Sequence, residues 1–375
     1  MEQHIESHII QSSDDEFIIN VGPQHPSTHG VLHLQLKLDG EKIVDLRPFL
    51  GYIHRGIEKM SESLTYKQFI YLTSRMDYLS AHINNQACCL VIEKGLQTEV
   101  PERAKVIRTL MAELTRLASH QLWWGSTGLD MGAVSPFFYA FREREMILEI
   151  FEETCGSRLT MNYCVPGGVM NDIHPDFVRK VKQLIKQFRE NIHEYDELLT
   201  GNPIFQSRTQ GIGYLSKEDA IALSCSGPVA RASGISCDVR KKNPYDAYDR
   251  VSFDEIIATE GDCFARYRVR LEEMKQSMNI IEQLIDNIPT GEYRTKIKGI
   301  IKLPVGEYYQ RVETARGELG VYLVSDGSNK PYRIKFRTPN FSNLGALKPM
   351  SLGGKIGDLV AIMASLDLII PDIDR

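Results

Sequence analysis

Residues 267–288 read YRVRLEEMKQSMNIIEQLIDNI, and the spacing of their apolar side chains predicts a long helix. These side chains follow one another alternately at four and three positions: Tyr267, Leu271, Met274, Met278, Ile281, Ile285 and Ile288. Such a stripe occupies one face of an α-helix, as long helices packed nearly antiparallel require. Ser252, followed three positions later by Glu255, matches a capping box and predicts that the helix begins at Ser252. This stretch indicates a helical bundle.

Two further helices are predicted earlier in the chain. The first begins at Pro101 and Glu102. Its apolar face carries Val106, Leu110, Leu114 and Leu117. The second begins near Pro175, and its apolar side carries Phe177, Val181, Leu184, Phe188 and Tyr195. We interpret these stripes as packing core rather than as binding surface.

Short β-type runs flank the helices on both sides. Before them come FIINV, the alternating VLHLQLKLDG and KIVDLRP, with a hairpin signal at Asp39-Gly40. After Pro289 come GEYYQRVET, LGVYLVSD and PYRIKFR. The predicted fold class is therefore α+β. The expected parts are an N-terminal β region (1–60), a central helical bundle (61–290) and a C-terminal α+β region (291–375).

Composition excludes several classes of protein. The 375 residues are 42% hydrophobic and 25% charged with a net charge of -5, so nucleic acid is not an expected partner. No segment reaches the roughly 18–20 apolar residues needed to cross a bilayer, and the N-terminus does not resemble a signal peptide. Seven scattered cysteines without a CxxC motif predict reduced thiols in a cytoplasmic compartment, packed as small hydrophobes.

The densest group of chemically useful residues is GPQHPSTHG at 22–30. Prolines stiffen this loop, and a glycine at each end permits backbone angles that other residues avoid. His25 and His29 are open to three interpretations, as ligands, as proton donors or as turn residues. Gly211 and Gly213 do not form a dinucleotide-binding fingerprint, because a third correctly placed glycine is missing.

Several motifs in order give the chain a specific resemblance. GPQHPSTHG is followed by GYIHRGIEK at 51–59 and SRMDY at 74–78. Later matching stretches are LDMGAVSPFF, PGGV, RTQGIGYL, SGPVARASG, PVGEYYQRVETARGELGVYLVSDG and PYRIKFRTPNF. Together they resemble the D-type subunit, also called the 49-kilodalton type, of respiratory complex I, the proton-pumping NADH:quinone oxidoreductase. The resemblance covers nearly the whole chain.

That family is similar to the large subunit of nickel–iron hydrogenases, so the resemblance implies a hydrogenase large-subunit-like fold. Those enzymes hold their metals with two CxxC motifs, because thiophilic metals need soft thiolates. The corresponding positions here are Asp77 and Ser80 in one segment and Ile369 and Asp372 in the other, and none is cysteine. We expect no metal in this chain, and expect the quinone headgroup in the vacated cavity.

The resemblance also implies which residues act. His29 and Tyr78 would hydrogen-bond the two quinone carbonyls, Asp130 would pair with His29, and His25 lies in the same binding loop. A quinone that takes two electrons also takes two protons, and imidazole and phenol groups are suitable donors. An aspartate partner would favour the charged imidazole. The alternative is that Tyr78 is a core residue and Asp130 a cap.

Arg55 falls where the family places a basic residue near the terminal iron–sulfur cluster of its B-type subunit, and a cation there would raise the cluster potential. The alternative is a surface salt bridge with Glu58. Thr160 and Val165 replace a histidine and an arginine common in the family, which predicts a low-potential, weakly pH-dependent cluster and menaquinone as acceptor. His33 replaces an arginine, without a physical explanation from sequence.

The leading hypothesis is the quinone-site subunit of complex I, with electrons arriving from a partner's 4Fe-4S cluster. FMN and NADH would bind other subunits. The expected partners are the B-type and C-type subunits, other hydrophilic subunits and the quinone-chamber membrane subunit. Contact with the cytoplasmic side of the inner membrane would come through these partners. A second hypothesis is a metal-free scaffold derived from a hydrogenase, and the missing cysteines oppose a third, an active hydrogenase.

Overall fold

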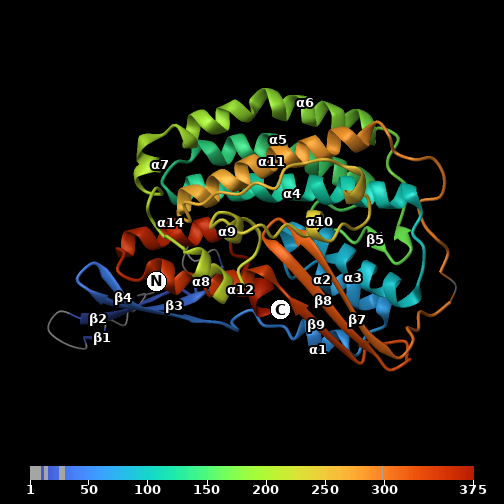
Figure 1. Cartoon of the computed structure of the whole chain (residues 1–375), viewed down its shortest axis with the longest axis horizontal. Helices are drawn as coiled ribbons and strands as arrows, with labels where there is room; N and C mark the ends of the chain where they lie inside the picture. Colours follow the sequence, from blue (N-terminus) through green and yellow to red (C-terminus); the bar gives the residue numbers. More distant parts are fainter. Residues whose placement is uncertain (1–9, 12–15, 25–29, 298) are drawn as a thin grey trace, which may run out of the picture.

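Long helices packed side by side form the centre of the molecule in the computed structural model, which describes residues 10–11, 16–24, 30–297 and 299–375. They are α4 (Glu102–Asp130), α5 (Ser135–Cys155), α6 (Phe177–Tyr195) and α11 (Cys263–Ile285). Their axes lie across the top of the view in Figure 1. Helix α4 contacts α5 and α11, and α6 contacts the same two helices. The predicted helical bundle is confirmed.

The predicted starts of two of the three helices are also confirmed. Pro101 is the N-cap residue of α4, and α6 begins at Phe177, two residues after Pro175. The predicted apolar faces of both helices are buried. These faces were predictable because the burial of an amphipathic helix follows its 3.6-residue period.

The predicted start of the third helix is wrong. Helix α11 begins at Cys263, and the Asp262 carboxylate caps it by accepting a hydrogen bond from the Ala265 amide at 2.7 Å. Ser252 instead lies in a coil segment, and its carbonyl accepts a hydrogen bond from the Gln283 side chain. The segment that carries Ser252 packs on α11, so its local capping pattern does not start a helix. Ile288 lies beyond the helix end at Ile285.

An antiparallel sheet of four strands forms the N-terminal part. Its strands are β1 (Ile10–Gln11), β2 (Glu16–Val21), β3 (His33–Asp39) and β4 (Lys42–Phe49). The predicted hairpin between β3 and β4 is confirmed, and Gly40 takes the left-handed angle (φ 56°) that the turn needs. Alternate leucines of β3 are buried in one core with residues of α14 (Ile356–Leu366), so segments from opposite ends of the sequence meet.

A second antiparallel sheet lies on the other side of the molecule (Figure 1). It consists of β7 (Gly306–Thr314), β8 (Gly317–Ser325) and β9 (Arg333–Arg337), close to the predicted runs. Helix α3 (Ala81–Leu96) packs on β7 and β8. Helices and small antiparallel sheets thus coexist, which agrees with the predicted α+β class.

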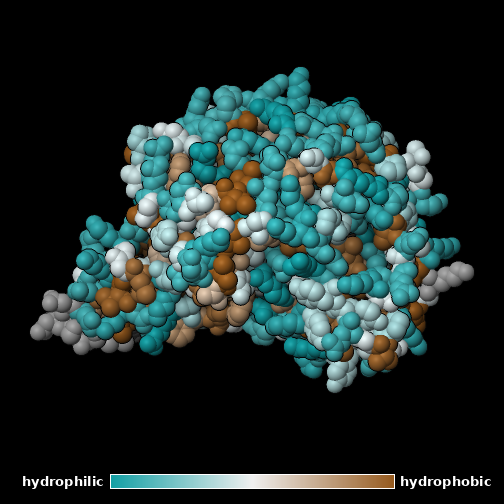
Figure 2. Space-filling view, in the orientation of Figure 1, coloured by the Kyte–Doolittle hydropathy of each residue, from teal (hydrophilic) through white to brown (hydrophobic). Residues whose placement is uncertain are grey.

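The remaining elements are short and connect these layers. They are α1 (Ile57–Ser61), α2 (Tyr66–Thr73), η2 (Tyr78–Ser80), β5 (Cys164–Val165), β6 (Gly168–Val169), η3 (Asp196–Thr200), α7 (Pro203–Ser207), α8 (Lys217–Ala222), α9 (Gly227–Arg231), α10 (Val239–Lys242), η4 (Tyr248–Arg250), α12 (Pro339–Leu344), α13 (Leu347–Ser351) and α15 (Ile370–Asp374). All seven cysteines are free thiols. Figure 2 shows a mostly hydrophilic face with apolar side chains in small groups. Within the described ranges, none of the helices combines the length and the apolar character that crossing a bilayer demands.

Candidate functional site

Arg316 joins three segments that are far apart in the sequence. It lies in the turn between β7 and β8, and its side chain is fully buried. One guanidinium nitrogen lies 3.1 Å from the Asp77 carboxylate, and the other lies 2.9 Å from the Asp367 carboxylate. Two further hydrogen bonds, to the Ser119 hydroxyl and the Asp367 carbonyl, hold the same side chain. The site is therefore fixed by a buried ion network rather than by a loop.

A third acid, Asp372 of α15, lies beside this network. Its carboxylate accepts a hydrogen bond of 2.7 Å from the Asn340 amide, and Asn340 in turn accepts one from the Ile369 backbone amide. Burial, together with the nearby Asp77 carboxylate, raises the pKa of Asp372 to about 7. The segments that carry the positions compared with the two CxxC motifs are thus close together in space.

Tyr78 is the first residue of η2, directly after Asp77. The Asp77 carboxylate accepts a hydrogen bond from the Leu79 amide at 3.1 Å, so the same acid caps η2 and binds Arg316. Tyr78 is half-buried, and burial raises its pKa above the ordinary value. Within the described ranges no residue makes a hydrogen bond with the Tyr78 hydroxyl. The phenol therefore keeps its proton at neutral pH and has that proton available for a ligand.

His25 and His29 lie outside the described residues. The described ends of their loop lie close to the rest of the fold. A Cβ on Gly22 would be 2.1 Å from the Leu32 carbonyl oxygen, and a Cβ on Gly30 would be 3.4 Å from Ile370 of α15. Gly30 thus brings the end of the loop to the helix that carries Asp372.

Asp130 is the last residue of α4 and is half-buried at the turn into α5. The turn is tight, because a Cβ on Gly128 would be 2.8 Å from Pro136. Helix α4 also contacts η2. The pairing of Asp130 with His29 stays a prediction, and so does the alternative of Asp130 as a cap.

The alternative salt bridge between Arg55 and Glu58 is wrong for the described structure. Arg55 is exposed and donates a 2.8 Å hydrogen bond to the Arg75 carbonyl. Glu58 is bound by Lys335 of β9 and by Arg375, each at 3.1 Å. Partial burial and the like charge of Arg75 lower the pKa of Arg55. Because its side chain is exposed, Arg55 presents its charge on the surface.

A pocket of about 460 Å³ lies between this segment and the C-terminal residues, lined among others by Leu50, Gly51, His54, Phe341 and Asp374. The Asp374 carboxylate fixes one wall, since it accepts hydrogen bonds from the Gly51 and Ile53 amides at 2.9 and 3.0 Å. Segments 51–58 and 373–375 are therefore one structural unit.

Sequence reasoning missed the roles of Arg316, Asp367 and Asn340. Two of these residues stand in stretches that were noticed only as matches: Arg316 in TARGELG and Asn340 in TPNF. An arginine between two strands, followed by glycine, was the available signal for Arg316. No pattern of spacing connects it with acids 239 and 51 positions away.

The three unusual positions lie on the surface or near it. His33 stacks on Phe49, with ring centroids 4.9 Å apart, and contacts the Tyr52 hydroxyl at 3.0 Å, which explains an imidazole at this position. Thr160 is half-buried. Val165, in β5, lines a pocket of about 410 Å³.

In the described part of the chain, no three or more His, Cys, Asp or Glu side chains are grouped so that they could hold a metal ion. The polar centre consists instead of one arginine among three carboxyl groups, with a phenol beside them. Such an arrangement fits hydrogen bonding to a polar headgroup and the donation of a proton.

Comparisons with known proteins agree with one another. The family described as respiratory-chain NADH dehydrogenase, 49 Kd subunit, matches residues 130–301 and 295–375. The chain is 54% identical over 362 residues to the C/D-type subunit of NADH-quinone oxidoreductase from Bacteroides thetaiotaomicron, across 96% of the chain and 68% of that relative. It is 49% identical over 361 residues to the D-type subunit from Geobacillus kaustophilus, across 96% and 98% of the two chains. It is 48% identical over 360 residues to the D-type subunit from Desulforamulus reducens, across 96% and 98%.

Proposed function

Because the chain belongs to the family of the 49-kilodalton subunit of respiratory-chain NADH dehydrogenase, we propose that it forms the quinone-reduction site of that complex. The chain is one subunit of a multisubunit NADH-quinone oxidoreductase, as the names of its relatives indicate. The observation that carries the proposal is the half-buried Tyr78 phenol, held on a rigid turn and not engaged by another described side chain.

In the proposed reaction, a quinone takes two electrons from the terminal 4Fe-4S cluster of a partner and two protons from this chain. Tyr78 donates to one quinone oxygen and His29 to the other, while His25 belongs to the same loop. The Asp130 carboxylate favours the charged imidazole of His29 and helps it to regain a proton. Each donor must lie within hydrogen-bond reach of the oxygen that it protonates.

The buried network supports this role by fixing the position of the phenol. Asp77 accepts from the backbone of η2 and from Arg316, so the turn that carries Tyr78 cannot shift without breaking a buried ion pair. Arg316 is in turn held by Asp367. Preorganised donors act without the cost of rearrangement at the moment of reaction.

The proposed partners follow from the family. We place the B-type subunit and its cluster against the face with Arg55 and Arg75, where a cation would raise the cluster potential. The C-type subunit is proposed as a neighbour because some relatives are named as fused C/D chains. FMN and NADH would bind other hydrophilic subunits. The membrane subunit of the quinone chamber would hold the assembly on the cytoplasmic side of the inner membrane.

We propose a hydrogenase large-subunit-like origin for the fold, with the parts 1–60, 61–290 and 291–375 described above. The proximity of segments 77–80 and 369–372 supports it, since these are the positions compared with the metal-binding cysteines. Thr160 and Val165 favour menaquinone as the acceptor. The competing function is a metal-free scaffold that binds partners and no quinone.

The test is Tyr78→Phe in the complex assembled in its native host, with the exposed Tyr214→Phe as matched control. Loss of the phenol should lower NADH:quinone turnover by about 100-fold or more. Electron transfer from NADH to an artificial acceptor upstream of the quinone should stay unchanged, as should the amount of assembled complex. Wild-type quinone turnover in Tyr78→Phe would favour the scaffold.

A further inference from the structure

A second ion network lies behind the site and has no role in the chemistry described so far. Its members come from α4, α9, α10, α11 and β7 and from the N-cap of α10, and none of their side chains is more than 3% exposed. They are Glu113, Arg116, Arg231, Asp238, Arg240, Glu273 and Glu313. We call them the internal network.

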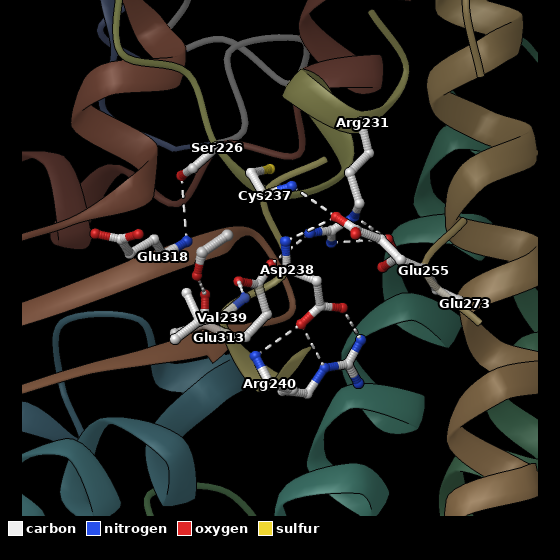
Figure 3. Close-up of polar contacts among 12 residues, drawn as sticks. Ser226, Arg231, Cys237, Asp238, Val239, Arg240, Glu255, Glu273, Glu313 and Glu318 are labelled. Atoms are coloured by element: carbon white, nitrogen blue, oxygen red, sulfur yellow. Dashed lines mark hydrogen bonds and ion pairs between the residues drawn. The ribbon is translucent and has the colours of Figure 1, made fainter. Parts of the chain in front are cut away.

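Arg231 binds two carboxylates of the internal network. Its guanidinium binds Glu273 at 2.8 Å and Glu313 at 2.7 Å, and Figure 3 shows it directed at both carboxylates. Arg240 binds Asp238 at 2.6 Å and Glu113 at 3.1 Å. Each carboxylate is therefore hydrogen-bonded, as burial of charge requires.

The internal network contains four carboxyl groups and three guanidinium groups. Guanidinium groups stay protonated, so an additional proton has to be carried by a carboxyl group or by a neighbouring histidine. Burial is the main reason that the pKa of Glu313 is raised to about 7, with Asp238 adding to the shift and Arg231 and Arg240 opposing it. Glu313 is thus the acid of the internal network whose pKa is raised, whereas the pKa values of Glu113, Asp238 and Glu273 are lowered.

His120 of α4 lies at the other end, with its Nε2 3.3 Å from the Glu273 carboxylate. It is fully buried, which lowers its pKa; Glu273 opposes this effect, and Arg116 and Arg270 add to it. His120 follows Ser119, the residue that binds Arg316 of the candidate site at 2.9 Å. The internal network therefore ends next to the network that positions Tyr78.

Arg270 of α11 lies between the two networks. It donates to the Ser365 carbonyl at 2.8 Å, and its charge acts on both Asp367 and Glu273. Two of its nitrogens, Nε and Nη2, have no hydrogen-bond partner among the residues that the structure describes. The same holds there for Asp367 Oδ2, for both ring nitrogens of His120 and for Glu273 Oε2. Buried polar atoms are rarely left unbonded, and water is their usual partner in such places.

We propose that Glu313 is an internal proton store that resupplies Tyr78 through the His120–Glu273 pair and through water bound at Arg270 and Asp367. This inference rests on the proposed function. Tyr78 gives its proton to a quinone oxygen and becomes a tyrosinate, and the His120–Glu273 pair returns a proton to it. Glu313 refills that pair, and no electron moves in these steps.

Solvent refills Glu313 from the side of α10. There Glu255, half-buried, accepts hydrogen bonds from the Cys237 and Asp238 amides, and the Val239 amide donates to Glu313 at 3.1 Å (Figure 3). The charged and titratable groups that face Glu313 are Arg231, Asp238, Arg240 and Cys237. The backbone of Glu313 is held by Arg116 and by the Tyr245 hydroxyl.

The test is the pH profile of NADH:quinone turnover in the assembled complex with Glu313→Gln. Arg231 and the Val239 amide bind different oxygens of Glu313, so glutamine keeps an acceptor for one of them, and it carries no exchangeable acid proton. We expect turnover at alkaline pH to fall roughly threefold to tenfold, the acid limb to be retained and the solvent deuterium isotope effect to increase. Glu318→Gln, which removes a surface partner of Arg311 on the neighbouring strand, is the matched control. A Glu313→Gln profile identical to wild type would overturn the proposal.

If the Glu313→Gln complex does not assemble, a second measurement on the wild-type complex tests the proposal. The infrared difference spectrum of the wild-type complex, recorded as quinone is reduced, should show a change in a protonated carboxyl band that shifts in heavy water. A wild-type spectrum without such a band overturns the store. Tyr78→Phe separates the two ideas. Slow turnover of Tyr78→Phe together with a wild-type pH profile of Glu313→Gln would refute the proton store and leave the proposed function standing. Fast turnover of Tyr78→Phe would refute the proposed function.

Discussion

Replacing Arg316 by leucine should destabilise the chain more than any surface substitution. The change leaves the carboxylates of Asp77 and Asp367 buried without their shared cation. Breaking a buried ion pair from one side costs about 3–5 kcal/mol. The lost hydrogen bonds to Ser119 and to the Asp367 carbonyl add about 1 kcal/mol each. We therefore expect a loss of about 5–7 kcal/mol at pH 8.

The loss should depend on pH in a defined direction. Without Arg316, two buried carboxylates lack their cation, and burial disfavours the charged form of a carboxyl group, so the folded variant binds more protons than the unfolded one. The free energy of unfolding of the variant then falls as the pH rises and these carboxyl groups ionise. Urea midpoints of the purified chain, measured at pH 5 and pH 8, should show the smaller loss at pH 5.

Two further variants make the measurement specific. Arg333→Leu removes a half-exposed arginine that binds Glu62 at 3.0 Å, and it should cost no more than about 1 kcal/mol. Adding Asp367→Asn to Arg316→Leu should recover part of the loss, because one stranded charge disappears. If Arg316→Leu cost as little as Arg333→Leu, or lost equal stability at both pH values, the reasoning about this buried network would be refuted.

Four other outcomes are expected. Between pH 5 and pH 8, the free energy of unfolding of Asp372→Asn should rise by about 1–3 kcal/mol relative to that of wild type. The reason is that the raised pKa of Asp372 makes wild-type stability fall as this acid ionises. Urea midpoints at both pH values measure the difference. Gly227→Ala should cost about 2 kcal/mol or more in the same assay, since a Cβ there would be 2.4 Å from the Arg316 carbonyl oxygen at φ +64°. Arg55→Gln should lower the potential of the partner's cluster by an amount on the order of tens of millivolts in a redox titration followed by electron paramagnetic resonance. With Thr160 in place of a titratable donor, the wild-type cluster potential should change by well under about 59 mV per pH unit, and a high-potential, strongly pH-dependent cluster would contradict menaquinone as acceptor.

Much of the fold was predictable because it follows periodic burial. The stripes of α4 and α6 and the alternation of β3 each repeat with the period of their element. The start of α11 was not predictable, because Ser252 and Glu255 form a good local capping pattern in a segment that packs on α11 without becoming helical. The Ser252 backbone binds Gln283 instead, and the Glu255 side chain binds the Cys237 amide. Tertiary contacts decided between two locally acceptable structures.

The site was only partly predictable for a related reason. Tyr78 could be chosen from a resemblance, whereas Arg316 and the internal network could not be found from spacing. Glu113 and Arg116 stand three positions apart on α4, a pattern typical of an exposed helical ion pair, yet both side chains are fully buried. The sequence shows which residues are charged. It does not show that Glu113 is bound by Arg240, from an element more than a hundred residues away.

The bond between Asp374 and the Gly51 amide joins residues 323 positions apart, and it has a consequence for biogenesis. A ribosome releases the N-terminal strands, Arg55 and Tyr78 long before Asp374 leaves the exit tunnel. Until then the wall beside the pocket has no carboxylate to fix it, and Glu58 lacks Arg375. A nascent chain, or one truncated before Asp374, would therefore present an unfinished pocket wall, and any docking that uses this wall has to wait until synthesis has passed these residues.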